Sequence, residues 1–227
     1  MNSKDKSKKK TKKRQGNFIY DFVKVTGAIP ALCWMRPKTV YISKTAKKGV
    51  KGGVLIASNH ISFTDPVLVH CVFWKRRLNC IATKDLFNTK LKNWFFNKMH
   101  CIMIDKDNFH VGSFHAVVDR LKEEKTVVIF PEGTVNRGEE ELQSYKTGVI
   151  LMAHISQKPI LPMYIAKINR WYNRRVVVIG EPIDVREMCG KIPSMEEIEK
   201  AGAYLREKEL ELMHYYQAHY QKEIQHD

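Results

Sequence analysis

Short apolar runs alternate with helix-length segments along this chain of 227 residues, and this alternation limits the fold more than any other feature. Runs of about four to eight β-branched and aliphatic residues are typical of buried strands. We expect strands near residues 53–58, 78–83, 101–105, 126–130, 160–166 and 174–180, and helices near 66–75, 89–99, 110–124 and 147–156. Such alternation predicts an α/β fold, with a mostly parallel sheet covered by helices on both faces.

The organisation of the chain follows from its length and its local composition. A chain of this size can bury one substantial core, and it is too short for two. We expect a disordered basic tail at residues 1–16, an N-terminal helical segment at 17–40 and a single domain at 41–227. That domain should end in a long helix, because Ser194 and Glu197 have the spacing of a capping box.

The basic tail carries much of the charge of the chain. Residues 1–14 hold eight Lys or Arg side chains against one Asp, which is +7 of the net +15. A segment with so few apolar residues does not fold alone. Its charge would suit an anionic membrane surface, a nucleic acid or simple solubility. No recognition element for nucleic acid accompanies it, so we expect no nucleic-acid partner.

The segment that follows the tail favours a membrane surface. Apolar residues recur there at helical spacing, and an uncharged stretch at 27–35 comes next. No run of about 18 apolar residues occurs, so the pattern predicts an interfacial helix rather than a spanning one. A helix packed on the core is the alternative. No signal-peptide pattern is present, and the five cysteines form no CxxC pair. We therefore expect a peripheral or monotopic protein on the cytoplasmic face of the cell membrane.

The first chemical motif is His60 with Asp65, placed directly after the apolar run 54–57. An imidazole titrates near neutral pH and can remove a proton from a hydroxyl, and a carboxylate can orient it. No GxSxG or reactive-cysteine motif accompanies the pair, so the substrate itself would supply the hydroxyl. The alternative is that Asp65 merely caps a helix that Pro66 opens. His110 and His115 have no helical metal-ligand spacing, so no metal site is predicted.

The second motif is the turn that ends the strand at 126–130. Pro131 cannot continue the ladder, and Gly133 allows a ligand to approach the backbone closely. Glu132 sits where the strand gives way to the turn. On turn chemistry alone, an ordinary strand-ending turn explains these residues as well as a binding site does.

Together the two motifs resemble those of the lysophospholipid acyltransferase family, which includes 1-acylglycerol-3-phosphate acyltransferases. The N-H-x4-D signature of the family corresponds to Asn59, His60 and Asp65, and its F-P-E-G-T signature to residues 130–134. Weaker blocks occur in the family's order at 102–106, 145–148, 160–163 and 180–183. The resemblance covers roughly residues 18–190 and makes the domain at 41–227 the catalytic domain.

The resemblance implies a reaction and its partners. An acyl group would move from acyl-CoA or acyl carrier protein to the sn-2 hydroxyl of 1-acylglycerol 3-phosphate, giving phosphatidic acid for phospholipid biosynthesis. His60 would act as the general base and Asp65 would orient it. The thioester is a co-substrate, so no cofactor is expected. The partners would be a lysophospholipid, an acyl thioester and an anionic membrane surface, with acyl carrier protein as one donor.

The acceptor site is where the chain departs from the family pattern. Glu132, Gly133 and Thr134 would shape this site, and Lys106, Arg137 and Lys146 are candidates for the acceptor phosphate. The family commonly has Arg where this chain has Val135 and Lys106. A lysine is a point charge rather than a bidentate fork. Glycerol 3-phosphate, another lysophospholipid and an acylated amino acid therefore remain alternative acceptors, and a non-catalytic membrane adaptor remains the alternative to an enzyme.

Overall fold

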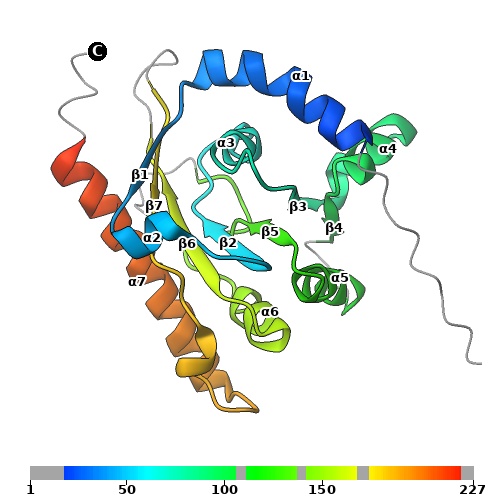
Figure 1. The fold of residues 1–227 in the computed structure, drawn as a ribbon. Coiled ribbons are helices and arrows are strands. Elements are labelled where there is room, and N and C mark those ends of the chain that lie inside the picture. Colours follow the sequence, from blue (N-terminus) through cyan, green and yellow to red (C-terminus); the bar gives the residue numbers. More distant parts are fainter. Residues whose placement is uncertain (1–17, 106–110, 137–141, 168–173, 221–227) are drawn as a thin grey trace, which may run out of the picture.

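The computed structural model describes residues 18–105, 111–136, 142–167 and 174–220, and the structural statements below concern these residues. They form one seven-stranded sheet in the order β1-β7-β6-β2-β5-β3-β4, with helices on both faces (Figure 1). The predicted basic tail at 1–16 and two candidate phosphate ligands, Lys106 and Arg137, lie outside the described residues.

The sheet is mostly parallel, as predicted. Its strands are β1 (Lys38–Tyr41), β2 (Val54–Ser58), β3 (Leu78–Thr83), β4 (Ile102–Ile104), β5 (Thr126–Ile129), β6 (Ile160–Ile165) and β7 (Val176–Ile179). Every pairing is parallel except that of β6 with β7. No strand was predicted before residue 53. Strand β1 pairs with β7, so the sheet begins at Lys38, inside the segment 17–40 that was predicted to be helical.

Helices cover both faces of the sheet, and the predicted helices all form. They are α1 (Phe18–Met35), α2 (Lys44–Lys48), α3 (Asp65–Val72), α4 (Lys90–Lys98), α5 (Val111–Lys122), α6 (Gly148–Ser156) and α7 (Met195–His219), with short 3₁₀ turns η1 (Lys84–Phe87) and η2 (Val185–Glu187). Helices α1 and α3 lie on one face, and α5, α6 and α7 lie on the other (Figure 1). The capping box of Ser194 and Glu197 is confirmed at the start of α7.

Strand β2 lies inside the sheet and is buried along its whole length. Successive side chains of a strand point to opposite faces. Leu55 and Ala57 accordingly pack with α5, α6 and α7, whereas Val54 and Ile56 pack with α3. Because β2 is packed on both faces and paired along both edges, the position of its carboxyl end is fixed. The residues that follow Ser58 therefore emerge at a defined point, at the carboxyl edge shared with β5 and β6.

Helix α1 is long and apolar enough to cross a membrane. Only 22% of its 18 residues are buried within the protein. Length and composition alone do not separate a membrane helix from the core helix of a soluble protein or from a signal sequence. The buried side chains include Tyr20 and Met35, which attach the helix to the domain, whereas Phe18, Phe22 and Ile29 are exposed.

Candidate active site

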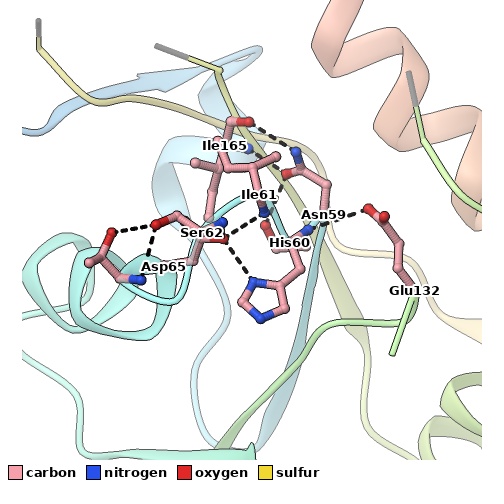
Figure 2. Close-up of polar contacts among 9 residues, drawn as sticks. Asn59, His60, Ile61, Ser62, Asp65, Glu132 and Ile165 are labelled. Carbon is pink, nitrogen blue, oxygen red and sulfur yellow. Dashed lines mark hydrogen bonds and ion pairs between the residues drawn. The ribbon is translucent and has the colours of Figure 1, made fainter. Parts of the chain in front are cut away.

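His60 and Asp65 meet as the sequence predicted. His60 follows the end of β2, Asp65 is the first residue of α3, and Nδ1 of His60 lies 2.8 Å from Oδ2 of Asp65 (Figure 2). The same oxygen accepts the backbone N–H groups of Ile61 at 2.7 Å and Ser62 at 2.8 Å. An ionised carboxylate only accepts hydrogen bonds, so Nδ1 carries the proton. The other ring nitrogen, Nε2, points away from Asp65 and retains its lone pair for a substrate (Figure 2).

The alternative interpretation, in which Asp65 only caps the helix that follows it, is wrong. Thr64 is the N-cap residue of α3, and no side chain caps this helix. The side chain of Asp65 instead binds the turn at residues 60–62, and only 1% of Asp65 is exposed. Burial lowers the pKa of the Arg175 guanidinium, and its electrostatic interaction with this carboxylate opposes that shift. The aspartate therefore orients the imidazole and can stabilise an imidazolium.

Asn59 joins the ends of two neighbouring strands. Its Nδ2 donates to the carbonyl of Ile165 at 2.9 Å, and its Oδ1 accepts the N–H of Ile165 at 2.7 Å (Figure 2). The side chain thus replaces one rung of the ladder where β2 and β6 end. Because Asn59 is buried, this pairing fixes the backbone immediately before His60.

The two sequence motifs form a single site. The N–H of His60 donates to Oε1 of Glu132 at 3.3 Å, and the N–H of Asn136 donates to the His60 carbonyl at 2.6 Å. The imidazole stacks on the ring of Phe130, with centroids 4.2 Å apart. Glu132 is buried, and burial raises the pKa of its carboxyl while the His60 and Gln143 backbone N–H groups lower it. In the structure Glu132 thus contacts the main chain beside the base.

Gly133, Thr134 and Lys146 lie together on the exposed side of this turn. Gly133 has a φ of +73°, and a Cβ built there would lie 2.9 Å from Cε and 3.1 Å from Nζ of Lys146. The backbone N–H of Lys146 donates to the Pro131 carbonyl at 3.1 Å. The hydroxyl of Thr134 donates to Oε1 of Gln143 at 3.0 Å. An exposed ammonium group therefore lies over the glycine of the second motif.

The model of the family described as Acyltransferase matches residues 37–166, which include the His60–Asp65 pair and the Glu132 turn. The chain belongs to the acyltransferase family. Among curated proteins, this acyltransferase is similar to three that are named 1-acyl-sn-glycerol-3-phosphate acyltransferase. The relative from Bacillus subtilis (strain 168) is 26% identical over 165 residues, which are 70% of this chain and 81% of the relative.

The other two relatives are matched over less of their length. The protein from Borreliella burgdorferi is 23% identical over 69% of this chain and 62% of its own length. The protein from Helicobacter pylori (strain J99) is 27% identical over 55% of this chain and 53% of its own length. This acyltransferase therefore spans less than two thirds of each of these two relatives.

A solved structure confirms the fold. The crystal structure of the 1-acyl-sn-glycerophosphate (LPA) acyltransferase PlsC from Thermotoga maritima superposes with a TM-score of 0.64. The match covers 88% of this chain and 80% of PlsC at 20% sequence identity. At that identity the likeness concerns the fold alone.

Two polar residues near the site of this acyltransferase, Arg175 and Glu209, were not predicted from the sequence, and Tyr145 was noted only as part of the block at 145–148. Each of the three lies far along the chain from the residue that it contacts or faces. Glu209 left a signal of its own, because it interrupts the apolar stripe of Leu205 and Leu212 on the last helix. Within the described ranges, no group of three or more His, Cys, Asp or Glu side chains could hold a metal ion.

Proposed function

We propose that this acyltransferase moves a fatty acyl group from a thioester to the sn-2 hydroxyl of 1-acylglycerol 3-phosphate, forming phosphatidic acid. The observation that carries the proposal is the 2.8 Å contact between His60 and Asp65, which leaves Nε2 of the imidazole as a base beside the Gly133 turn. The names of the three curated relatives support this acceptor. The donor is acyl-CoA or acyl-loaded acyl carrier protein.

The reaction needs one base and no enzyme nucleophile. The acceptor hydroxyl donates its proton to Nε2 of His60 while its oxygen attacks the thioester carbonyl. The Asp65 carboxylate stabilises the imidazolium that forms. Collapse of the tetrahedral intermediate breaks the C–S bond and completes the ester, and the imidazolium returns its proton to the departing thiolate. General-base catalysis of this kind contributes about 10²–10⁴-fold to the rate.

The acceptor phosphate binds on the Gly133 side of the site. The Lys146 ammonium lies over Gly133, where the absence of a Cβ leaves room for it. Lys106 and Arg137 remain candidates for the same phosphate on sequence grounds. Thr134 presents a hydroxyl on the same turn. This turn also carries Glu132, which accepts the backbone N–H of His60, so a phosphate placed there would bind to a segment that contacts the base.

The acyltransferase works at an anionic membrane surface, on the cytoplasmic face. Helix α1 supports this proposal because Phe18 is 82% exposed and Ile29 is 66% exposed, and Phe22 lies one turn from Phe18. Large exposed apolar side chains beside a basic segment suit the interface between headgroups and acyl chains. The lysophospholipid would then reach the site from the bilayer without crossing water.

The test is an acyl-transfer assay on purified full-length protein with lysophosphatidate, using acyl-CoA and acyl carrier protein donors in parallel. His60→Ala should lower kcat by about 10²–10⁴-fold, because the base is lost. His115→Ala is the matched control, since this histidine is exposed on α5. Wild-type rates in His60→Ala would refute the mechanism. Faster turnover of glycerol 3-phosphate, another lysophospholipid or an acylated amino acid would refute the acceptor while leaving the mechanism intact.

A further inference from the structure

A buried carboxyl group of the last helix bonds to the acceptor side of the site. Glu209 of α7 is 0% exposed, and its Oε2 accepts the hydroxyl proton of Tyr145 at 2.5 Å. The backbone N–H of Asn59 faces the same carboxyl group and favours its ionised form. An acidic side chain is rarely fully buried, because removing it from water costs free energy. Its place between Tyr145 and the residue before His60 therefore calls for a role.

A second side chain of α7 holds the same segment. Arg206 donates through Nη2 to the Leu142 carbonyl at 2.7 Å and through Nε to the Gln143 carbonyl at 3.3 Å. Arg206 and Glu209 are three positions apart, so they lie on one face of the helix. That face of α7 holds a segment without helix or strand structure through three hydrogen-bonded residues, which are Leu142, Gln143 and Tyr145.

The segment that α7 holds closes onto the turn of the second motif. Gln143 accepts the hydroxyl of Thr134, and the N–H of Lys146 binds the carbonyl of Pro131. Lys146 directly follows Tyr145 and places its ammonium over Gly133. The position of this ammonium is thus linked to α7 through the hydroxyl of Tyr145 and through the backbone carbonyls of Leu142 and Gln143.

We propose that Glu209 and Arg206 are positioning residues, which hold the segment 142–146 so that Lys146 stays over Gly133 and binds the phosphate of the acceptor. This inference rests on the acyl-transfer reaction and the acceptor site proposed above. It assigns to α7 a part in acceptor affinity, although neither side chain touches the acceptor.

The bond from Tyr145 requires an acceptor oxygen on the Glu209 side chain and does not require a charge there. Burial raises the pKa of this carboxyl group well above the ordinary value of 4.5, and the negative charge of Glu132 raises it further. The bonds from Tyr145 and Asn59 oppose this shift without cancelling it. An uncharged amide of the same shape offers Tyr145 the same acceptor oxygen. Glu209→Gln should therefore keep the function that Glu209→Met loses.

The experiment compares Glu209→Met, Glu209→Gln, Tyr145→Phe and Arg206→Met in the full-length protein, with Glu207→Gln as the control on the exposed face of α7. Equilibrium binding of a short-chain lysophosphatidate and the KM of each substrate are measured for every variant. Glu209→Met and Tyr145→Phe should each weaken acceptor binding about tenfold, the usual effect of one lost hydrogen bond. The KM of the thioester should change by less than about twofold. The double variant Glu209→Met/Tyr145→Phe should bind the acceptor no more weakly than either single variant, because both substitutions remove the same bond.

Unchanged acceptor affinity in folded variants, or an equal rise in both KM values, would overturn the inference. A loss in Glu209→Gln as large as that in Glu209→Met would do the same. If Glu209→Met does not fold, Tyr145→Phe decides the matter, because it removes only the hydroxyl. A wild-type protein that does not acylate lysophosphatidate refutes the proposed function. A wild-type protein that acylates it, with variants that bind it equally well, refutes only the role of α7.

Discussion

The proposed base and the proposed acceptor side of this site are built in different ways. His60 and Asp65 are five positions apart, and one short turn brings them together with the N–H groups of Ile61 and Ser62. The acceptor side combines Gly133 and Lys146 with Glu209, which lies in a helix more than sixty positions after Tyr145. The base is thus a local structure on the end of one strand, whereas the acceptor side depends on the packing of the whole domain.

This difference has a functional consequence. A local structure keeps its geometry as long as β2 and the start of α3 remain folded, so substitutions elsewhere should leave the base in place. The acceptor side can change through any residue of the chain of contacts from α7 to Gly133. The chemistry should therefore resist substitution outside its turn, and acceptor preference should not.

The largest effect should follow from Asp65→Asn. An amide at this position can no longer hold the Nδ1 proton in place, so the imidazole can present the wrong tautomer to the acceptor. We expect kcat to fall by about 10³–10⁴-fold. Steady-state kinetics would measure the loss, with Asp85→Asn as a control on an exposed aspartate. A kcat within about tenfold of wild type would show that orientation by Asp65 is not needed.

The next effect concerns stability at the same strand end. Asn59→Ala removes both hydrogen bonds to Ile165. The backbone N–H and C=O of Ile165 then have no partners in a buried site. Each orphaned buried group costs about 1–3 kcal/mol, so the free energy of unfolding should fall by about 2–6 kcal/mol. Urea unfolding would measure it, with the exposed Asn88→Ala as the control. A change below about 0.5 kcal/mol would show that the ladder alone fixes this end.

A smaller effect is expected on the acceptor side. Gly133→Ala places a methyl group 2.9 Å from Cε of Lys146, at a residue whose φ is +73°. The backbone conformation should cost about 1–2 kcal/mol of stability. Displacement of the ammonium should also raise the KM of the acceptor severalfold. Gly49→Ala is the matched control, because its φ is +66° and no atom lies within 4 Å of the added Cβ. An unchanged acceptor KM in Gly133→Ala would show that the position of Lys146 does not affect phosphate binding.

The sequence predicts one half of this comparison well. Apolar runs located β2 and β5, and the spacing of His60 and Asp65 indicated the base, because each of these signals lies within a few consecutive residues. Strand β1 was missed because its four residues, Lys38–Tyr41, carry little apolar pattern and acquire their structure by pairing with β7. The same pattern also cannot distinguish the antiparallel pairing of β7 with β6 from a parallel one.

The acceptor side could not be predicted to the same depth. Nothing in the residues around Tyr145 indicates that its hydroxyl will meet a carboxyl group on the last helix. Glu209 in an apolar stripe shows only that a polar group is buried, not which group it binds. Arg175 likewise faces Asp65 only because β7 joins the sheet beside β6. Long-range polar contacts follow from tertiary packing, and a single sequence does not encode them locally.

The smallest effect, compared within one pH unit, should be a pH dependence of stability. Below about pH 4.5 the Glu209 carboxyl is protonated in both the folded and the unfolded chain, so it adds no pH dependence. As the pH rises, the unfolded chain releases this proton while the folded protein keeps it, because burial raises the pKa of Glu209. The free energy of unfolding should therefore fall with rising pH, by at most about 1.4 kcal/mol per pH unit.

Glu209→Gln should remove this contribution, and its stability relative to wild type should increase as the pH rises above about 4.5. Glu132 is present in both proteins, so only its electrostatic coupling to Glu209 remains in the difference. Chemical denaturation at several pH values would measure the slope, and Glu207→Gln should show a flat difference. A flat difference for Glu209→Gln would mean that the carboxyl is already ionised in the folded protein. Its bond to Tyr145 would then be charge-assisted, and α7 would hold the acceptor segment by a buried charge rather than by a neutral acid.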